Sequence, residues 1–249
     1  MNVAIHGNNS REEVISCLKQ NSSIGVVDDI KNADVLISLG GDGTLLNTLS
    51  IVGSLEIPVL GVNLGRLGFL TCVSRDDIPQ LADMLIKGAF TPVKRRVLKV
   101  SLSNEVFYAL NEAAILRNEN TSVISVEVLV DERPLNVYSG DGVIFATPTG
   151  STAYSLSCGG PILLPSSDNF VVTPIASHTL TVRPLVLTGD AVIKATCSSD
   201  FKFTLDSRSF NLRADTPIVM QRADFSFVTM KLNEKSFFDT LGEKLSWGK

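Results

Sequence analysis

The hydrophobic pattern of this chain changes its period near Val97, and that change limits the possible folds more than any other feature. Before Val97, short apolar runs at residues 3–5, 35–39 and 58–62 alternate with segments whose apolar side chains have helical spacing. Because tight turns cannot join parallel strands, strands that alternate with helices form a parallel sheet. We therefore predict an α/β N-terminal domain with a parallel sheet.

From Val97 onward the pattern is typical of strands. Apolar and polar residues alternate, as in Leu98, Val100 and Leu102, and turn residues recur about every ten positions. One of the expected strands covers residues 180–187. Many short strands in succession predict an all-β, sandwich-like C-terminal domain.

The end of the chain returns to helical spacing at residues 236–245. We expect this segment to return to the first domain. The predicted domains are therefore residues 1–96 together with a returning segment at 225–249, and a β-rich domain at residues 97–224.

Composition excludes several classes of protein. Hydrophobic residues make up 44% of the chain and charged residues 19%, so the chain is not disordered. With 22 lysines and arginines against 26 aspartates and glutamates, its net charge is −4, and it lacks the basic stripe that a nucleic-acid partner requires. The four cysteines have neither C-x-x-C pairing nor histidines at metal-ligand spacing, and no apolar run is long enough to span a membrane. We expect a cytoplasmic protein that binds no nucleic acid and no membrane.

The strongest local signal is the run Gly40-Gly41-Asp42-Gly43-Thr44, which follows an apolar run and precedes a helical segment. Ligands of open α/β folds bind at this edge of the sheet, and glycines let the backbone approach phosphate closely. An aspartate there would repel phosphate unless it held Mg²⁺ or accepted a proton from a hydroxyl. The alternative is that Asp42 only caps the helix.

A second glycine-rich turn covers residues 63–70 and includes Arg66, which could pair with a phosphate or lie in solvent. Neither the P-loop pattern nor the G-x-G-x-x-G pattern occurs in the chain. The phosphate-binding elements must therefore be of another kind.

A third cluster lies in the β-rich part, where six hydroxyl side chains besides Tyr154 stand between Thr147 and Ser157. Such a cluster can bind a sugar or an adenine edge, and Tyr154 offers a stacking face. A short helix with Ser151 as its N-cap is a compatible interpretation. Asn111-Glu112 and Gly140-Asp141-Gly142 are further polar runs in the same part.

Together these motifs, in this order and spacing, resemble those of the NAD kinase family, from about residue 34 to residue 184. The Gly-Gly-Asp-Gly-Thr turn alone is shared with diacylglycerol, sphingosine and 6-phosphofructo kinases, whereas the hydroxyl-rich segment is the specific element. The resemblance implies an α/β domain followed by a β-sandwich-like, dinucleotide-binding domain. It also implies phosphorylation of the adenosine ribose 2′-hydroxyl of NAD by ATP with Mg²⁺ or another divalent cation, in a homodimer or homotetramer.

The resemblance also implies roles for individual residues. Asp42 would be the proton acceptor, while Gly40, Gly41, Thr44 and Arg66 would hold phosphate; the metal ligands stay unassigned. The residues implied to bind NAD are Asp42, Gly43, Asn111, Glu112, Asp141, Thr149, Thr152, Ala153, Tyr154, Ser155, Leu156, Ser157 and Ala176.

Three positions depart from the family pattern: Ser139, Ser177 and the run Asp206-Ser207-Arg208, where many members have Asp-Gly-Gln. These departures keep two alternatives open. One is another kinase of the same superfamily with a lipid or sugar acceptor, and the other is a non-catalytic sensor of NAD or NADP.

Overall fold

The structure is a computed structural model that describes residues 1–7, 10–65 and 68–246. The chain divides into two compact units. The first contains Met1–Lys94 and the segment from Phe227 onward, and the second contains Arg95–Ser226.

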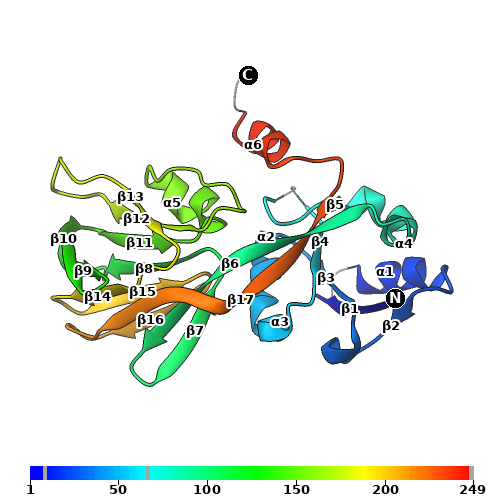
Figure 1. Cartoon of the computed structure of the whole chain (residues 1–249), viewed down its shortest axis with the longest axis horizontal. Coiled ribbons are helices and arrows are strands. Elements are labelled where there is room, and N and C mark those ends of the chain that lie inside the picture. Colours follow the sequence, from blue (N-terminus) through cyan, green and yellow to red (C-terminus); the bar gives the residue numbers. More distant parts are fainter. Residues whose placement is uncertain (8–9, 66–67, 247–249) are drawn as a thin grey trace. The chain divides into compact units, whose positions relative to one another are not determined.

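The first unit is built on a parallel sheet (Figure 1). Its strands are β1 (Asn2–His6), β2 (Gly25–Val26), β3 (Val35–Leu39), β4 (Val59–Asn63) and β5 (Val73–Ser74), in the order β2-β1-β3-β4 with β5 also on β4. Every pairing among them is parallel. The last strand of the chain, β17 (Ile218–Leu232), ends in this unit, where Thr229 pairs in parallel with Val59. The predicted α/β fold with a returning C-terminal segment is confirmed.

The first unit also contains helices and 3₁₀ turns. They are α1 (Arg11–Lys19), α2 (Asp42–Asn47), α3 (Leu49–Val52), α4 (Leu81–Ile86) and α6 (Phe237–Leu245), with 3₁₀ turns η1 (Ile30–Asn32), η2 (Gly53–Leu55) and η3 (Arg75–Gln80). Buried side chains of α1 and α4, such as Leu18 and Leu81, pack with those of β1, β3 and β4. On β4, a side chain at Gly61 would meet Leu45 of α2 at 2.8 Å, so glycine lets α2 pack closely against the sheet.

The helical segment after β5 is divided into two pieces, η3, which contains Pro79, and the short helix α4. Proline lacks the N–H that an α-helix needs in its interior, which explains the break. Among the described residues, no helix is both long and apolar enough to cross a membrane.

The second unit is a sandwich of antiparallel strands. One sheet has the order β13-β12-β11-β8-β15-β16, and the other contains β10-β9-β14-β17. The strands are β6 (Phe90–Leu102), β7 (Glu105–Ala109), β8 (Glu112–Arg117), β9 (Ile124–Val130), β10 (Arg133–Gly140), β11 (Gly142–Ala146), β12 (Asn169–Ile175), β13 (Leu185–Thr188), β14 (Ile193–Cys197), β15 (Phe201–Leu205) and β16 (Arg208–Leu212). The predicted sandwich-like β domain is confirmed.

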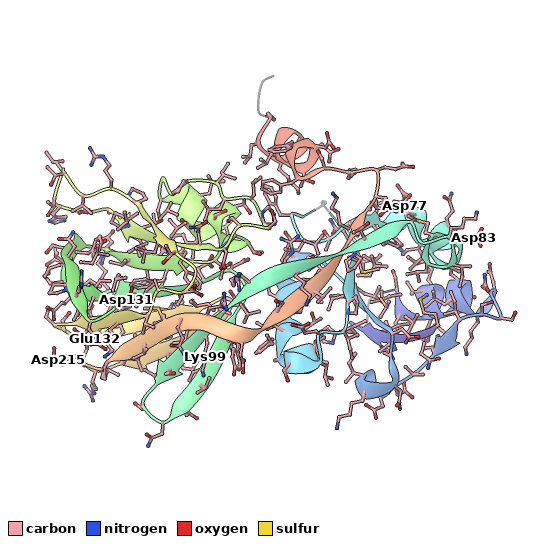
Figure 2. All side chains as sticks on the ribbon, in the orientation of Figure 1. Asp77, Asp83, Lys99, Asp131, Glu132 and Asp215 are labelled. Atoms are coloured by element: carbon pink, nitrogen blue, oxygen red, sulfur yellow. The ribbon has the colours of Figure 1, made fainter. Side chains whose placement is uncertain are left out.

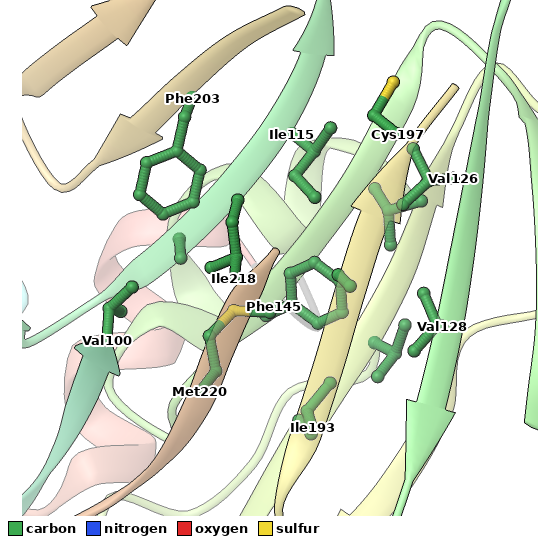
Figure 3. Packing of buried hydrophobic residues seen from close by; sticks show 14 of the residues in the cluster. Val100, Ile115, Val126, Val128, Phe145, Ile193, Cys197, Phe203, Ile218 and Met220 are labelled. Atoms are coloured by element: carbon green, nitrogen blue, oxygen red, sulfur yellow. The ribbon is translucent and has the colours of Figure 1, made fainter. Parts of the chain in front are cut away.

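Side chains of both sheets fill one apolar core (Figure 3). Phe145 and Phe203 come from the first sheet, and Val128, Ile193 and Met220 come from the second, all fully buried. Alternate residues of each strand point inward, which is the period-two pattern seen in the sequence.

At two turns of this unit, local residues determine where the chain changes direction. Asp131 and Glu132, labelled in Figure 2, join β9 to β10 with φ angles of 49° and 62°. The prediction of a strand over residues 180–187 is wrong, because the strand β13 covers Leu185–Thr188 and pairs there with β12. Before β13 the Arg183 side chain donates hydrogen bonds to the carbonyls of Leu180 and Val182, and Pro184 has no N–H to donate to a neighbouring strand.

Candidate active site

The Gly40–Thr44 turn lies at the carboxyl end of β3. Gly40 has a φ of +152°, and a Cβ there would lie 2.3 Å from the Thr44 Oγ1 atom, so only glycine fits. A Cβ at Gly41 or Gly43 would meet nothing within 4 Å. The turn thus offers open backbone at the edge of the sheet, the arrangement that a phosphate group requires.

The Asp42 side chain points away from its own helix. Its Oδ2 atom accepts a hydrogen bond from the Phe69 N–H at 2.7 Å, and its Oδ1 atom accepts from the N–H groups of Leu70 and Thr71 at 3.1 and 3.2 Å. The residue at the N-cap of α2 is Gly41, without a side-chain bond. The interpretation of Asp42 as a simple helix cap is therefore wrong.

These bonds bring the two glycine-rich turns of the sequence together. A Cβ at Gly68 would lie 1.8 Å from the Asp42 Oδ1 atom, so glycine at this position is what lets the carboxylate reach the loop. Asn63 shapes the start of the same loop, since its Oδ1 atom accepts from the Gly65 N–H at 3.0 Å. Arg66, predicted to pair with phosphate, lies outside the described residues.

The residues of this turn do not form a preformed cage for a divalent cation. In the described part of the chain no group of three His, Cys, Asp or Glu side chains could hold a metal ion, and both Asp42 oxygens already accept N–H donors. Mg²⁺ keeps several waters and binds mostly through substrate phosphates. Protein ligands alone therefore do not fit it here.

In the second unit, Asn111 and Glu112 lie where the chain enters β8. Asp206, in the turn after β15, accepts hydrogen bonds from the N–H groups of Leu110 and Asn111, both at 2.8 Å, and of Glu112 at 3.2 Å. Burial and then the negative charge of Asp206 raise the pKa of Glu112 from 4.5 to about 8, although a backbone hydrogen bond with Tyr154 lowers it. Burial also raises the pKa of Asp206, against the lowering effect of its three N–H donors and of Arg208.

The hydroxyl-rich segment folds as a 3₁₀ turn, η4 (Gly150–Thr152), followed by one turn of helix, α5 (Tyr154–Ser157). The predicted cap is wrong: Ser151 lies inside η4, and its hydroxyl donates to the Pro148 carbonyl at 2.7 Å and accepts from the Leu163 N–H at 2.9 Å. The bond with Leu163 ties the segment to the chain beyond α5.

The predicted NAD-binding residues of this segment differ in their exposure. Thr149 and Ser155 are buried; the Thr149 hydroxyl accepts from Arg95 at 3.5 Å, and the Ser155 hydroxyl contacts that of Thr173 at 2.8 Å. The other predicted residues are more accessible, with Tyr154 and Ser157 exposed and Thr152, Ala153 and Leu156 half-buried.

Three ionisable groups of this unit act on the Tyr154 hydroxyl. Burial and then the charges of Cys158, Asp141 and Glu112 raise its pKa. The residue is 38% exposed, so part of its side chain is accessible to a ligand.

Asp141 and Ala176 come together at the edge of β11 and β12. The Asp141 N–H donates to the Ile175 carbonyl at 3.0 Å, and its carboxylate pairs with Arg117 at 2.7 Å. Ala176 has a φ of 44°, and a Cβ at Gly140 would meet its carbonyl oxygen at 2.8 Å.

Sequence reasoning missed the function of Asp206, which it noted only in a run that departs from the family pattern. Its contacts with residues 110–112 join segments almost a hundred residues apart. An acidic residue between two predicted strands was the one available signal.

Comparisons with known proteins place these elements in one family. Residues 5–90 match the model of the ATP-NAD kinase N-terminal domain, and residues 110–229 match that of the ATP-NAD kinase C-terminal domain. An NAD kinase of Porphyromonas gingivalis strain W83 is 45% identical over 230 residues, which cover 90% of this chain and 80% of that protein.

Two solved structures share the fold. The crystal structure of an NAD kinase from Archaeoglobus fulgidus in complex with ATP has a TM-score of 0.85 and 28% identity, and covers 100% of both chains. The yeast NADH kinase complexed with NADH has a TM-score of 0.90 at 24% identity and covers 100% of this chain and 88% of that chain.

Proposed function

The chain belongs to the NAD kinase family and phosphorylates NAD with ATP, and we propose that Asp42 is the proton acceptor of this reaction. A ribose hydroxyl is a poor nucleophile at neutral pH, so a positioned carboxylate that takes its proton assists the attack. In this step the 2′-oxygen forms a bond to the γ-phosphorus, the bond from that phosphorus to the β,γ-bridging oxygen breaks, and ADP leaves. The hydroxyl proton passes to a carboxylate oxygen of Asp42.

One observation carries this proposal: the Asp42 carboxylate is turned away from its helix and held by three backbone N–H groups of the neighbouring loop. A side chain that only capped α2 would accept hydrogen bonds from the first N–H groups of α2 and not from residues 69–71. Fixed donors keep the carboxylate in one orientation, and a general base requires such an orientation.

Phosphate binding falls to the open backbone around Asp42. We assign Gly40, Gly41, Thr44 and Arg66 to the phosphates of ATP, on the support of the open space beside Gly41 and of the backbone conformation of Gly40, which only glycine adopts freely. A divalent cation, which we take to be Mg²⁺, would arrive bound to the phosphate oxygens of ATP and would offset their charge.

NAD binding falls to Asp42 and Gly43 in the first unit and to a larger group in the second. Hydroxyl, amide and carboxyl side chains there match the donors and acceptors of a ribose and an adenine ring, and Tyr154 adds an aromatic face. The second-unit group is Asn111, Glu112, Asp141, Thr149, Thr152, Ala153, Tyr154, Ser155, Leu156, Ser157 and Ala176.

Replacement of Asp42 by asparagine tests the proposal. The Asp42→Asn variant keeps an oxygen that can accept hydrogen bonds from the loop but loses the basic carboxylate. We expect NADP formation from NAD and ATP to fall by about 10²–10⁴-fold, and NAD affinity to fall far less than turnover.

Asp34→Asn is the matched control. Asp34 precedes β3 as Asp42 follows it, and its carboxylate also accepts a backbone hydrogen bond, from the Asn2 N–H at 2.7 Å. Turnover of Asp34→Asn should equal that of the wild type. Wild-type turnover in Asp42→Asn would remove Asp42 as the proton acceptor.

We also propose that the protein is a homodimer or homotetramer in the cytoplasm. The edge strand β13 supports association, because Leu185 and Val186 are exposed on it and Leu180 nearby is 86% exposed. Light scattering on the purified chain would measure its mass, and a monomer at micromolar concentration would contradict the assignment.

A further inference from the structure

The backbone of residues 110–112 is held completely by two residues from distant segments. The Asp206 carboxylate accepts all three N–H groups of Leu110, Asn111 and Glu112, and the Asp206 N–H donates to the Glu112 carbonyl at 3.0 Å. Asp206 thus satisfies four of the six polar groups of this turn.

Thr147 satisfies the other two. Its hydroxyl donates to the Leu110 carbonyl at 2.5 Å, and its N–H donates to the Asn111 carbonyl at 2.8 Å. Gly150 closes around the same turn, since a Cβ there would lie 2.1 Å from the Asn111 carbonyl oxygen. With every backbone group of the turn engaged, the side chains of Asn111 and Glu112 are the parts that can respond to a ligand.

Burial raises the pKa of Asp206, and its hydrogen bonds favour the charged form against that effect. It lies in a left-handed turn with a φ of 49°, and three N–H donors replace the water that its charge loses on burial. Arg208, two residues on, lowers the pKa of Asp206 and donates a hydrogen bond to the Tyr108 carbonyl. The Arg208 that departs from the family pattern therefore links the Asp206 segment to β7.

Glu112 has the opposite surroundings. Its Oε2 atom is buried and has no hydrogen-bond partner among the described residues, and the Asp206 charge disfavours a second carboxylate beside it. A neutral carboxylic acid can donate a hydrogen bond, which a carboxylate cannot do.

We propose that Asp206 is a positioning residue for NAD: it fixes the Asn111–Glu112 turn, so that the buried Oε2 atom of Glu112 is placed to donate a hydrogen bond to an oxygen of the dinucleotide. This inference rests on the proposed assignment of Asn111 and Glu112 to NAD binding. Beyond that assignment, it states that Glu112 is protonated when it binds NAD and that Asp206 acts through the turn without touching the ligand.

The proposal makes NAD affinity depend on pH. Burial and Asp206 set the pKa of Glu112 at about 8, so affinity should fall above that pH by up to about tenfold per pH unit. The groups that act directly on Glu112 are the Asp206 charge and a backbone hydrogen bond with Tyr154. The charges of Cys158 and Asp141 act on Tyr154, and that of Arg208 acts on Asp206. Burial raises the pKa of Tyr154 above 10 and that of Cys158 above 9, so both titrate at higher pH than Glu112.

The test is titration calorimetry of the full chain with NAD alone between pH 6 and pH 9.5. For the wild type we expect constant affinity up to about pH 7.5 and a loss above pH 8. In Asp206→Asn the opposing charge is gone, so we expect at least about tenfold weaker binding at pH 7 and a fall that begins at lower pH. A pH-independent wild-type affinity would overturn the protonated donor, and wild-type affinity in Asp206→Asn would overturn the positioning role.

Two further variants keep the test decisive. Asp200→Asn is the matched control: Asp200 precedes β15 as Asp206 follows it, accepts the Ala214 N–H at 3.0 Å and pairs with Arg213, so its affinity profile should match that of the wild type. If Asp206→Asn does not fold, Glu112→Gln decides the question, because the amide cannot titrate and the loss above pH 8 should vanish. Persistence of that loss in Glu112→Gln would refute the proposal. Failure of the NAD kinase function itself would appear differently, as no NADP formation by the wild type at any pH.

Discussion

Replacement of Glu112 by glutamine should change how the stability of the protein depends on pH. Burial and the Asp206 charge raise the pKa of Glu112 from 4.5 to about 8. Between these values the folded state keeps a proton that the unfolded state has released, so the wild type loses stability as pH rises through this window. A shift of this size corresponds to about 5 kcal/mol, and local relaxation with entry of water reduces it, so we expect about 2–5 kcal/mol.

The assay is urea denaturation followed by circular dichroism at pH 5 and at pH 9. The free energy of unfolding of Glu112→Gln, relative to that of the wild type, should be higher at pH 9 than at pH 5 by about 2–4 kcal/mol. Glu105→Gln is the control, because Glu105 is an exposed carboxylate on β7 of the same unit. If the two variants show the same pH dependence to within about 0.5 kcal/mol, the argument for a protonated Glu112 fails.

Three further predictions follow from close contacts. Gly68→Ala places a Cβ 1.8 Å from the Asp42 carboxylate, so NADP formation should fall at least about tenfold, whereas Gly242→Ala, where a Cβ meets nothing within 4 Å, should keep full activity. Thr147→Val removes the donor to the buried Leu110 carbonyl and should lower the free energy of unfolding in urea by about 1–3 kcal/mol. Phe145→Ala empties part of the sandwich core and should cost about 3–5 kcal/mol in the same assay, and a loss below 1 kcal/mol would mean that the core collapses around the gap.

The fold was predictable to the extent that it depends on local periodicity. A strand that is buried on both faces, such as residues 35–39, is a continuous apolar run, and a strand that is buried on one face alternates, as the chain does after Val97. Both patterns can be seen in a short stretch of sequence. The strand expected at 180–187 failed because Leu180 is exposed and the chain there turns. Hydrophobic spacing cannot distinguish an exposed apolar loop from a strand.

The site was predictable in its residue types and less so in its contacts. The odd aspartate in a glycine-rich turn pointed to Asp42, but whether Asp42 capped its helix depended on a loop almost thirty residues away. The role of Asp206 depends on contacts across a still longer separation. Such contacts follow from strand order, which local pattern does not specify.

The order of strands in the first unit sets a delay during synthesis of the chain. Strand β4 is buried between β3 and the end of β17, yet the ribosome must add every residue up to Thr229 before that residue can pair with Val59. At 5–20 residues per second this takes roughly 8–30 s after β4 emerges. During that time β5 pairs only with Val62 and Asn63, and the Val59 end of β4 stays an unpaired edge. Such an edge is the kind of surface that chaperones bind and that aggregates form on.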